Sequence, residues 1–160
     1  MKITILNDNA PGRNCIAEFG LSYLIECDKK ILFDTGASNV FLQNAKKLNI
    51  FLDNIDAVVL SHGHWDHGNG LAYLKGLKLI CHPSAFIRRF NKKDNSYVGL
   101  NLEFKEYRSL FEINTTAEPY KISAEITFLG EIPRKLDFEN NPANRDIVLG
   151  FIKHLESITS

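Results

Sequence analysis

The sequence predicts an α/β fold, and three observations support this class. Residues 57–60, Ala-Val-Val-Leu, are apolar and β-branched, as expected for a buried strand. Residues 77–81 form a second apolar run of strand length. Between the expected strands, residues 38–48 carry apolar side chains at helical spacing, with Ser38 or Asn39 available as the N-cap. Strands that alternate with a helix are typical of α/β domains.

Composition indicates one globular domain, residues 1–160. It also argues against nucleic acid and membranes as partners. Hydrophobic residues make up 44% of the 160 residues, which excludes a disordered chain. Nineteen Lys and Arg balance nineteen Asp and Glu, so the chain has no overall bias toward nucleic acid or a membrane surface. We expect neither partner, and interpret the basic group of Arg88, Arg89, Lys92 and Lys93 as a solvated face. Three cysteines without a Cys-x-x-Cys pair argue against a disulfide framework and favour the cytoplasm.

The remaining elements follow from local patterns. Residues 7–14 contain turn chemistry, and residues 101–114 show no clean period. The other expected elements, in chain order, are a strand at 2–6, a hairpin of strands at 19–26 and 30–33, a short helix at 84–90, a strand at 124–129, and a helix or strand at 147–158.

The most informative stretch is Ser61–Gly70, Ser-His-Gly-His-Trp-Asp-His-Gly-Asn-Gly, directly after the strand expected at 57–60. Three of the five histidines and one aspartate fall within six positions. If the chain is extended through His62 and His64, their side chains point the same way and chelate one divalent ion. Asp66 and His67 splay apart from that pair and hold a second ion beside the first. The alternative, solvated loop histidines, does not account for four ligand-type residues in this order.

This stretch resembles the metal-binding signature of the metallo-β-lactamase superfamily. Other segments resemble its branch of small metal-dependent hydrolases, over about residues 1–139: Ile31–Gly36 with its strand-ending Asp-Thr-Gly, Leu6–Asn9, Gly20–Ser22, Asn44–Ala45, His82–Pro83 and Gly130–Arg134. The resemblance implies an αββα sandwich of two similar halves. We expect this chain to hold the first half and an incomplete second half, so the domain is expected to be incomplete at its C-terminus.

Four residues outside the histidine stretch are candidates for the site. Asp34 ends the strand at 30–33 and is interpreted as a carboxylate that supports the histidine loop, or as a turn or helix-cap residue. His82 follows the strand at 77–81 and reaches substrate or metal if that strand is parallel to its neighbour; a strand-end histidine without function is the alternative. In the resembled fold the loop of Asp8 and Asn9 overhangs the metals, so these residues either face substrate or make local turn hydrogen bonds.

The second half of the resembled fold supplies further ligands that this sequence does not show. The one histidine after His82 is His154, which is not in a glycine-rich turn. Each ion therefore lacks at least one expected ligand, since zinc takes about four. Three sources are open: His82 or the late carboxylates Asp137, Glu139 and Asp146; a second copy in a homodimer; or no source at all, in a truncated site.

The resemblance implies a metal-dependent hydrolase in which a metal-bound hydroxide attacks an ester or phosphoester of a small molecule. His62, His64, Asp66 and His67 are the expected ligands, and Asp66 also orients the hydroxide. Zinc is the expected metal, as one or two ions, with manganese or iron as alternatives. One line of the branch makes a pterin-linked phosphoribosyl aminobenzene compound, which implies a phosphorylated substrate. The rival hypothesis is a metal-binding or structural remnant of the fold without turnover.

Overall fold

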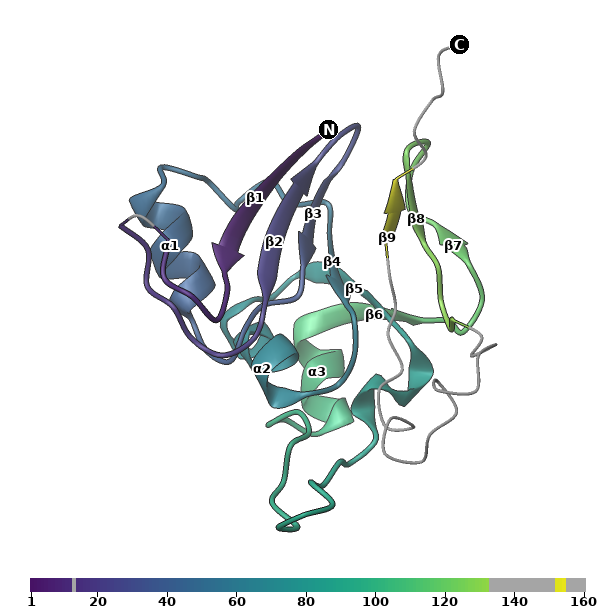
Figure 1. Ribbon diagram of the computed structural model, residues 1–160. Coiled ribbons are helices and arrows are strands. Elements are labelled where there is room, and N and C mark those ends of the chain that lie inside the picture. The colour runs from purple at the N-terminus through teal and green to yellow at the C-terminus, as the bar shows by residue number, and fades with distance from the viewer. Residues whose placement is uncertain (13, 133–151, 155–160) are drawn as a thin grey trace.

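The computed structural model describes residues 1–12 and 14–132, together with the backbone of residues 152–154. Its main sheet has six strands that neighbour one another in chain order (Figure 1). They are β1 (Lys2–Asn7), β2 (Ser22–Glu26), β3 (Lys30–Phe33), β4 (Ala57–Leu60), β5 (Leu77–Cys81) and β6 (Phe111–Thr115). The β1–β2 and β2–β3 pairs are antiparallel, and every later pair is parallel. The carboxyl ends of β3, β4 and β5 therefore meet at one edge of the sheet.

Helical segments connect the parallel strands. The α-helices are α1 (Val40–Lys47), α2 (Trp65–Gly68) and α3 (Phe104–Leu110), and the 3₁₀ helices are η1 (Asn69–Tyr73) and η2 (Pro83–Phe86). The first of them, α1, buries Phe41 and Ala45 against one face of the sheet, in a core that also holds Tyr107 of α3. Asn44 points inward from α1 and binds Leu6 and Ile16, so the helix also anchors the loop after β1.

A smaller sheet covers part of the opposite face of the main sheet. It contains β7 (Tyr120–Lys121), β8 (Ile126–Phe128) and β9 (Ile152–His154) (Figure 1). Ile126 and Phe128 of β8 pack against Val59 and Ile80 of the main sheet. The described residues thus form helices, sheet and second sheet in successive layers. This agrees with the expected α/β class and with three of the four layers of an αββα sandwich.

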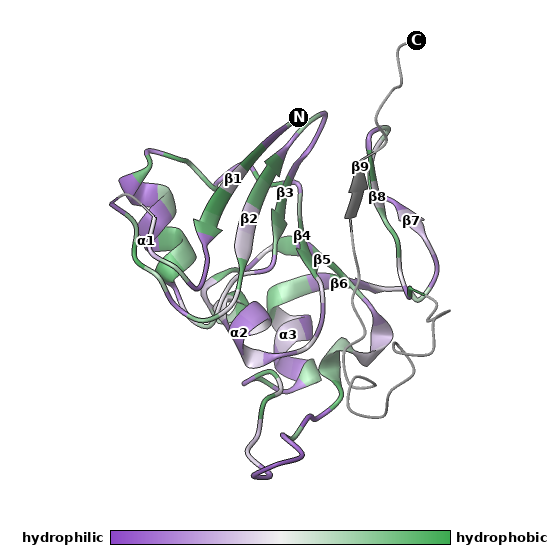
Figure 2. Ribbon diagram, viewed as in Figure 1, coloured by the Kyte–Doolittle hydropathy of each residue, from purple (hydrophilic) through white to green (hydrophobic). Residues whose placement is uncertain are grey.

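The central position of β4 explains its uninterrupted apolar sequence. Val58 and Leu60 belong to the core beneath the helices, whereas Ala57 and Val59 belong to the core beneath the small sheet. A strand covered on both faces has no solvent-facing positions, so its sequence does not alternate. Figure 2 shows the hydrophobic colouring of these central strands, and the hydrophilic colouring of much of the long loop after η2. The histidine stretch therefore begins where the most deeply buried strand ends.

Most of the expected elements are confirmed, and one expectation is wrong. Residues 84–90 do not form a helix: η2 ends at Phe86 and the chain is extended at Ile87. Residues 101–114, which show no clean period in the sequence, contain α3 and most of β6. Asp137, Glu139 and Asp146, and the side chains of the element expected at 147–158, lie outside the described residues. In the described part of the chain, no helix has the length and apolar character needed to cross a membrane.

Candidate metal centre

The first pair of histidines is brought together by an extended backbone. The chain leaves β4 at Leu60 and is still extended at His64, with φ −91° and ψ 151°, before α2 begins at Trp65. Residues two apart on an extended chain project to the same side. Nε2 of His62 accordingly lies 3.0 Å from Nδ1 of His64, and the ring centroids are 4.5 Å apart.

The second pair lies in the first turn of α2 and meets the first pair. Nε2 of His67 is 3.8 Å from Oδ2 of Asp66. The ring centroid of His67 is 4.2 Å from that of His62, so the two pairs are adjacent. The four candidate ligands thus lie at the carboxyl end of β4 as two neighbouring pairs.

The Asp34 carboxylate supports both pairs through hydrogen bonds. Its side chain is fully buried, and its backbone has a positive φ of 55°. Its Oδ1 accepts from the backbone N–H of Ser61 at 2.7 Å, and its Oδ2 accepts from the Ser61 hydroxyl at 2.6 Å. Oδ2 also lies 2.7 Å from Nδ1 of His67. The carboxylate therefore connects the end of β3 with the end of β4 and the start of α2.

This network assigns a tautomer to two of the imidazoles. The single hydroxyl proton of Ser61 goes to Asp34, so Oγ of Ser61 accepts from Nδ1 of His62 at 2.9 Å. His67 likewise donates from Nδ1 to Asp34. In the neutral form, each of the two rings then presents an unprotonated Nε2, the form in which histidine binds a metal.

The ionisation of the site follows from burial and from charge. Burial, reinforced by His67, His64 and Arg89, lowers the pKa of His62 to about 3, so this ring is neutral. Burial opposes protonation of His67, but the hydrogen bond and charge of Asp34 outweigh it and raise the His67 pKa. Burial also raises the pKa of the Asp34 carboxyl, against the effect of its donors.

Other parts of the chain fix the backbone of the turn. Thr35 donates from its backbone N–H to the carbonyl of His67 at 2.8 Å, and Trp65 donates to the carbonyl of Val98 at 3.1 Å. Gly20 packs so closely that a Cβ there would overlap the carbonyl oxygen of Asp66, and a Cβ at Gly63 would overlap that of Ala85. The segment Ser61–Gly68, named the metal turn from here on, is therefore enclosed by the backbone of other segments. Only glycine, which has no side chain, allows such close contacts.

The donor set fits divalent metal ions. Two nitrogens on one tetrahedral zinc ion lie about 3.4 Å apart, given bonds of about 2.0–2.1 Å. The 3.0 Å between His62 and His64 is close to this separation. The Asp66–His67 pair offers the carboxylate and imidazole donors that suit a second ion. Within the described residues, each pair supplies two of the roughly four ligands that zinc takes.

The remaining candidates lie around the metal turn rather than in it. Asp8 accepts from the neighbouring backbone N–H of Asn9 at 2.6 Å, as in a local turn. Asn9 accepts from the backbone N–H of Gly20 at 2.8 Å, so it holds the loop that packs on Asp66. His82 follows β5, which is parallel to β4, and therefore emerges at the metal edge.

Two residues near the turn were missed as site residues in the sequence. Ser61 begins the histidine stretch, but nothing in the spacing indicates that its hydroxyl joins Asp34 to His62. Arg89 was interpreted as part of a solvated face. Its guanidinium instead donates to the carbonyls of Ser84, Ala85 and Ile87. No sequence pattern signals such contacts, because they depend on the bend after η2.

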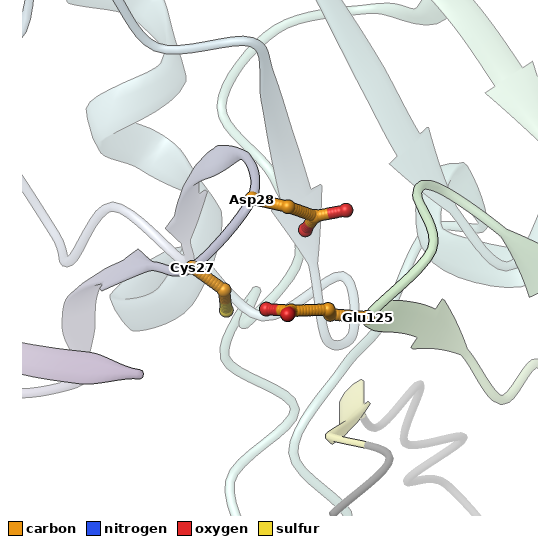
Figure 3. A group of neighbouring side chains, drawn as sticks. All are labelled: Cys27, Asp28 and Glu125. Atoms are coloured by element: carbon orange, nitrogen blue, oxygen red, sulfur yellow. The ribbon is translucent and has the colours of Figure 1, made fainter. Parts of the chain in front are cut away.

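A different cluster of ligand-type side chains lies at the hairpin after β2. Cys27, Asp28 and Glu125 bring their ligand atoms within 4.8 Å of one another (Figure 3). Asp28 accepts from the Ser123 hydroxyl at 2.8 Å and from the backbone N–H of Ala124 at 3.1 Å. Burial and the charge of Glu125 raise the pKa of the Cys27 thiol, so it stays protonated. We interpret this cluster as a polar contact between the two sheets.

Comparison with known proteins decides the family. The model of the metallo-β-lactamase superfamily matches residues 16–82, which include Asp34 and all four candidate ligands. The crystal structure of Tm1679, a metal-dependent hydrolase of the β-lactamase superfamily, superposes with a TM-score of 0.69 at 32% identity. The chain belongs to the metallo-β-lactamase superfamily. Divalent metal ions are bound by proteins of this superfamily, and the matched residues 16–82 include the turn described above.

The similar proteins are longer than this chain. An uncharacterized protein of Methanocaldococcus jannaschii is 38% identical over 86% of this chain and 56% of its own length. The 7,8-dihydropterin-6-methyl-4-(β-D-ribofuranosyl)-aminobenzene-5′-phosphate synthase of the same organism is 32% identical over 89% of this chain and 55% of its own length. The match to Tm1679 covers 81% of this chain and 47% of that one. The chain thus spans about half the length of the relatives it matches.

Proposed function

We propose that this chain carries one half of the active site of a metal-dependent hydrolase that acts on an ester or phosphoester of a small molecule. The observation that carries the proposal is the convergence of two ligand pairs, His62 with His64 and Asp66 with His67, on one turn. Superfamily membership supports the same reaction class.

The proposed roles follow from the hydrogen bonds. His62 and His64 hold one ion, and Asp66 and His67 hold a second. When bound, the ions supply Lewis acids that polarise a substrate oxygen and make water acidic enough to ionise near neutral pH. Asp34 and Ser61 keep Nε2 of His62 unprotonated, and Asp34 holds the proton of the neutral His67 ring on Nδ1, so that its Nε2 faces the metal. Asp66, whose side chain is 24% exposed, accepts a hydrogen bond from the attacking water and orients it. Zinc is the proposed metal, with manganese or iron as alternatives.

The substrate that we propose is a phosphorylated small molecule. Support comes from the name of one relative, a synthase of an aminobenzene 5′-phosphate compound, which matches 89% of this chain. Phosphate oxygens are also suitable groups to be bound between two divalent ions.

A second candidate is a metal-binding or structural remnant without turnover. The observation that favours it is the number of donors: each pair offers two, and a catalytic zinc site has three protein ligands and an open position. Under this hypothesis the turn binds metal but does not catalyse hydrolysis.

We further propose that a second copy of the chain, in a homodimer, supplies the further ligands that each metal ion needs. Ile3 and Ile5 of β1 pair with Ile25 and Tyr23 of β2, so they extend the face that carries the small sheet. Their side chains are nevertheless 52% and 54% exposed. A second copy placed on this apolar strip would bury it and bring a second set of side chains toward the site. Sedimentation equilibrium of the Ile3→Ser, Ile5→Ser variant tests this, with monomers expected only in the variant; monomers in both would refute the dimer.

The test of function combines metal analysis with turnover. Bound metal per chain is measured by elemental analysis for the wild type and for His64→Ala, Asp66→Ala and Asp53→Ala. Asp53 is an exposed connector residue outside the site, so it is the matched control for Asp66. A panel of phosphodiesters and esters is assayed in parallel.

Three outcomes separate the hypotheses. About two ions per chain, with turnover lost in Asp66→Ala and kept in Asp53→Ala, support the hydrolase. Bound metal without turnover in the wild type supports the remnant. No bound metal, and no change in His64→Ala, would refute both.

A further inference from the structure

His82 has a defined tautomer. It follows β5 and is only 9% exposed. The backbone N–H of Ser84 donates to its Nδ1 at 3.1 Å, and the Ser84 hydroxyl lies 2.7 Å from the same nitrogen. A nitrogen that accepts a hydrogen bond carries no proton, so in the neutral ring the proton is on Nε2. His82 therefore presents an N–H donor from Nε2.

This donor lacks an acceptor within the described residues. Nε2 of His82 is buried and makes no hydrogen bond there. The carboxylate of Glu131 comes within 3.8 Å, which is too far for a hydrogen bond, and its side chain is 62% exposed. Buried donors are almost always satisfied, so this one calls for an acceptor from outside the described residues.

Two contacts place His82 beside the metal turn. Leu60 of β4 pairs with Cys81 of β5, so the next residues, Ser61 and His82, lie side by side at the sheet edge. The segment after His82 also packs on the turn, because Ala85 lies directly against Gly63. Ser61 in turn contacts the ring of His62 at 2.9 Å. Any acceptor on His82 is therefore close to the candidate ligands.

A positive charge lies on the segment that follows His82. Arg89 is held against this segment by three backbone carbonyls, and a Cβ at Gly63 would lie 2.7 Å from its Nη1. Its positive charge reaches the metal turn, where it contributes to the low pKa of His62. Two carboxylates also lie near. Asp34, beyond Ser61 in the strand order, already accepts three hydrogen bonds from Ser61 and His67, and the exposed Glu131 is able to swing away.

We propose that Nε2–H of His82 binds an anionic oxygen of the substrate, and that the Glu131 carboxylate competes for the same donor. The ligand class is a phosphate or carboxylate group attached to the small molecule. This inference rests on the proposed hydrolase function and adds a substrate-binding residue to it.

The primary test needs no turnover. Long-range ¹H–¹⁵N spectra of the full ¹⁵N-labelled chain report the protonation of each imidazole nitrogen. Inorganic phosphate, and acetate in a separate arm, are titrated into metal-free and zinc-loaded protein. We expect Nε2 of His82 to carry the proton and to shift saturably with the preferred anion in both forms. Glu131→Gln removes the competing charge and should tighten anion binding about threefold or more. A His82 signal that neither anion shifts, or a ring protonated on Nδ1 alone, would overturn the proposal.

A kinetic test separates this inference from the proposed function. His82→Leu should raise KM about tenfold or more for an anionic phosphodiester, and less than about twofold for a neutral ester. His82→Gln, which keeps an N–H donor, should recover part of the loss. If His82→Leu raised KM equally for both substrates, and its thermal unfolding were unchanged, a contact between His82 and the substrate anion would be refuted. Wild-type turnover without any response of His82 would overturn this inference alone, whereas an anion response without turnover would overturn only the hydrolase.

Discussion

The backbone carbonyl of Asp66 rests directly against Gly20, so closely that no side chain fits between the two residues. Gly20 also has a positive φ of 102° and donates from its backbone N–H to the side chain of Asn9. A loop that lies more than forty residues before the metal turn thus fixes the position of a candidate ligand.

Gly20→Ala is expected to displace Asp66 and to lower metal content. The added Cβ must move one of the two backbones, which also reduces the free energy of unfolding. Gly76→Ala is the matched control, since Gly76 has a positive φ of 71° but no atom within 4 Å of an added Cβ. The control should lose about 1–2 kcal/mol and keep its metal. Urea unfolding and elemental analysis measure both quantities, and equal metal content in the two variants would contradict the prediction.

Ser61→Ala should weaken metal binding without unfolding the protein. Removal of the hydroxyl frees Nδ1 of His62 and takes one donor from Asp34, so the unprotonated Nε2 is no longer enforced. Loss of such a supporting contact costs about 10–100-fold in metal affinity. Competition with a chromogenic chelator measures the dissociation constant. Ser109→Ala, which removes an exposed hydroxyl bonded to Glu106, should leave the affinity unchanged.

Asn44→Ala is expected to destabilise the fold by about 2–3 kcal/mol. The amide donates to the carbonyls of Leu6 and Ile16 and accepts from the backbone N–H of Ile16, and alanine leaves these groups unpaired. Gln43→Ala, on the exposed side of the same helix, should change stability by less than about 0.5 kcal/mol. Denaturant unfolding of both variants provides the comparison. Similar losses in the two would show that the amide is not needed to hold the loop after β1.

Stability should fall at alkaline pH because of Cys81. Burial raises the pKa of this thiol to about 12 from an ordinary value of 9.0. The unfolded chain therefore loses the thiol proton more readily than the folded chain, so the free energy of unfolding decreases as pH rises above 9. The loss is about 1.4 kcal/mol for each pH unit above 9. Urea unfolding at pH 8 and pH 10 should show the decrease in the wild type and a smaller one in Cys81→Ala, and equal decreases would refute the assignment.

Short-range patterns predicted the features that depend on neighbouring residues. The spacing of His62 and His64 predicted their convergence because an extended chain fixes side-chain direction over two residues. The continuous apolar run at 57–60 predicted a buried strand, and the structure covers this strand on both faces. The placement of His82 at the metal edge followed from one assumption, that β5 is parallel to β4, and the structure confirms it.

The sequence did not predict features that depend on tertiary contacts. The helix expected at 84–90 is wrong because Arg89 bonds the carbonyls of Ser84, Ala85 and Ile87, and the chain bends away at Ile87. The helix α3 was not predicted from the sequence. It buries mainly Tyr107, so its seven residues show no clear helical spacing of apolar side chains. The link from Ser61 to Asp34 joins residues 27 positions apart, and such a separation leaves no local signal.

The contacts that shape the metal turn come from residues between Asn9 and Asn101. The arrangement of donors is therefore set before the chain reaches the second sheet. Substitutions in the described residues after β6 would therefore leave the geometry of the two ligand pairs in place, so the binding of cations and the shape of the later segment are separable in this fold.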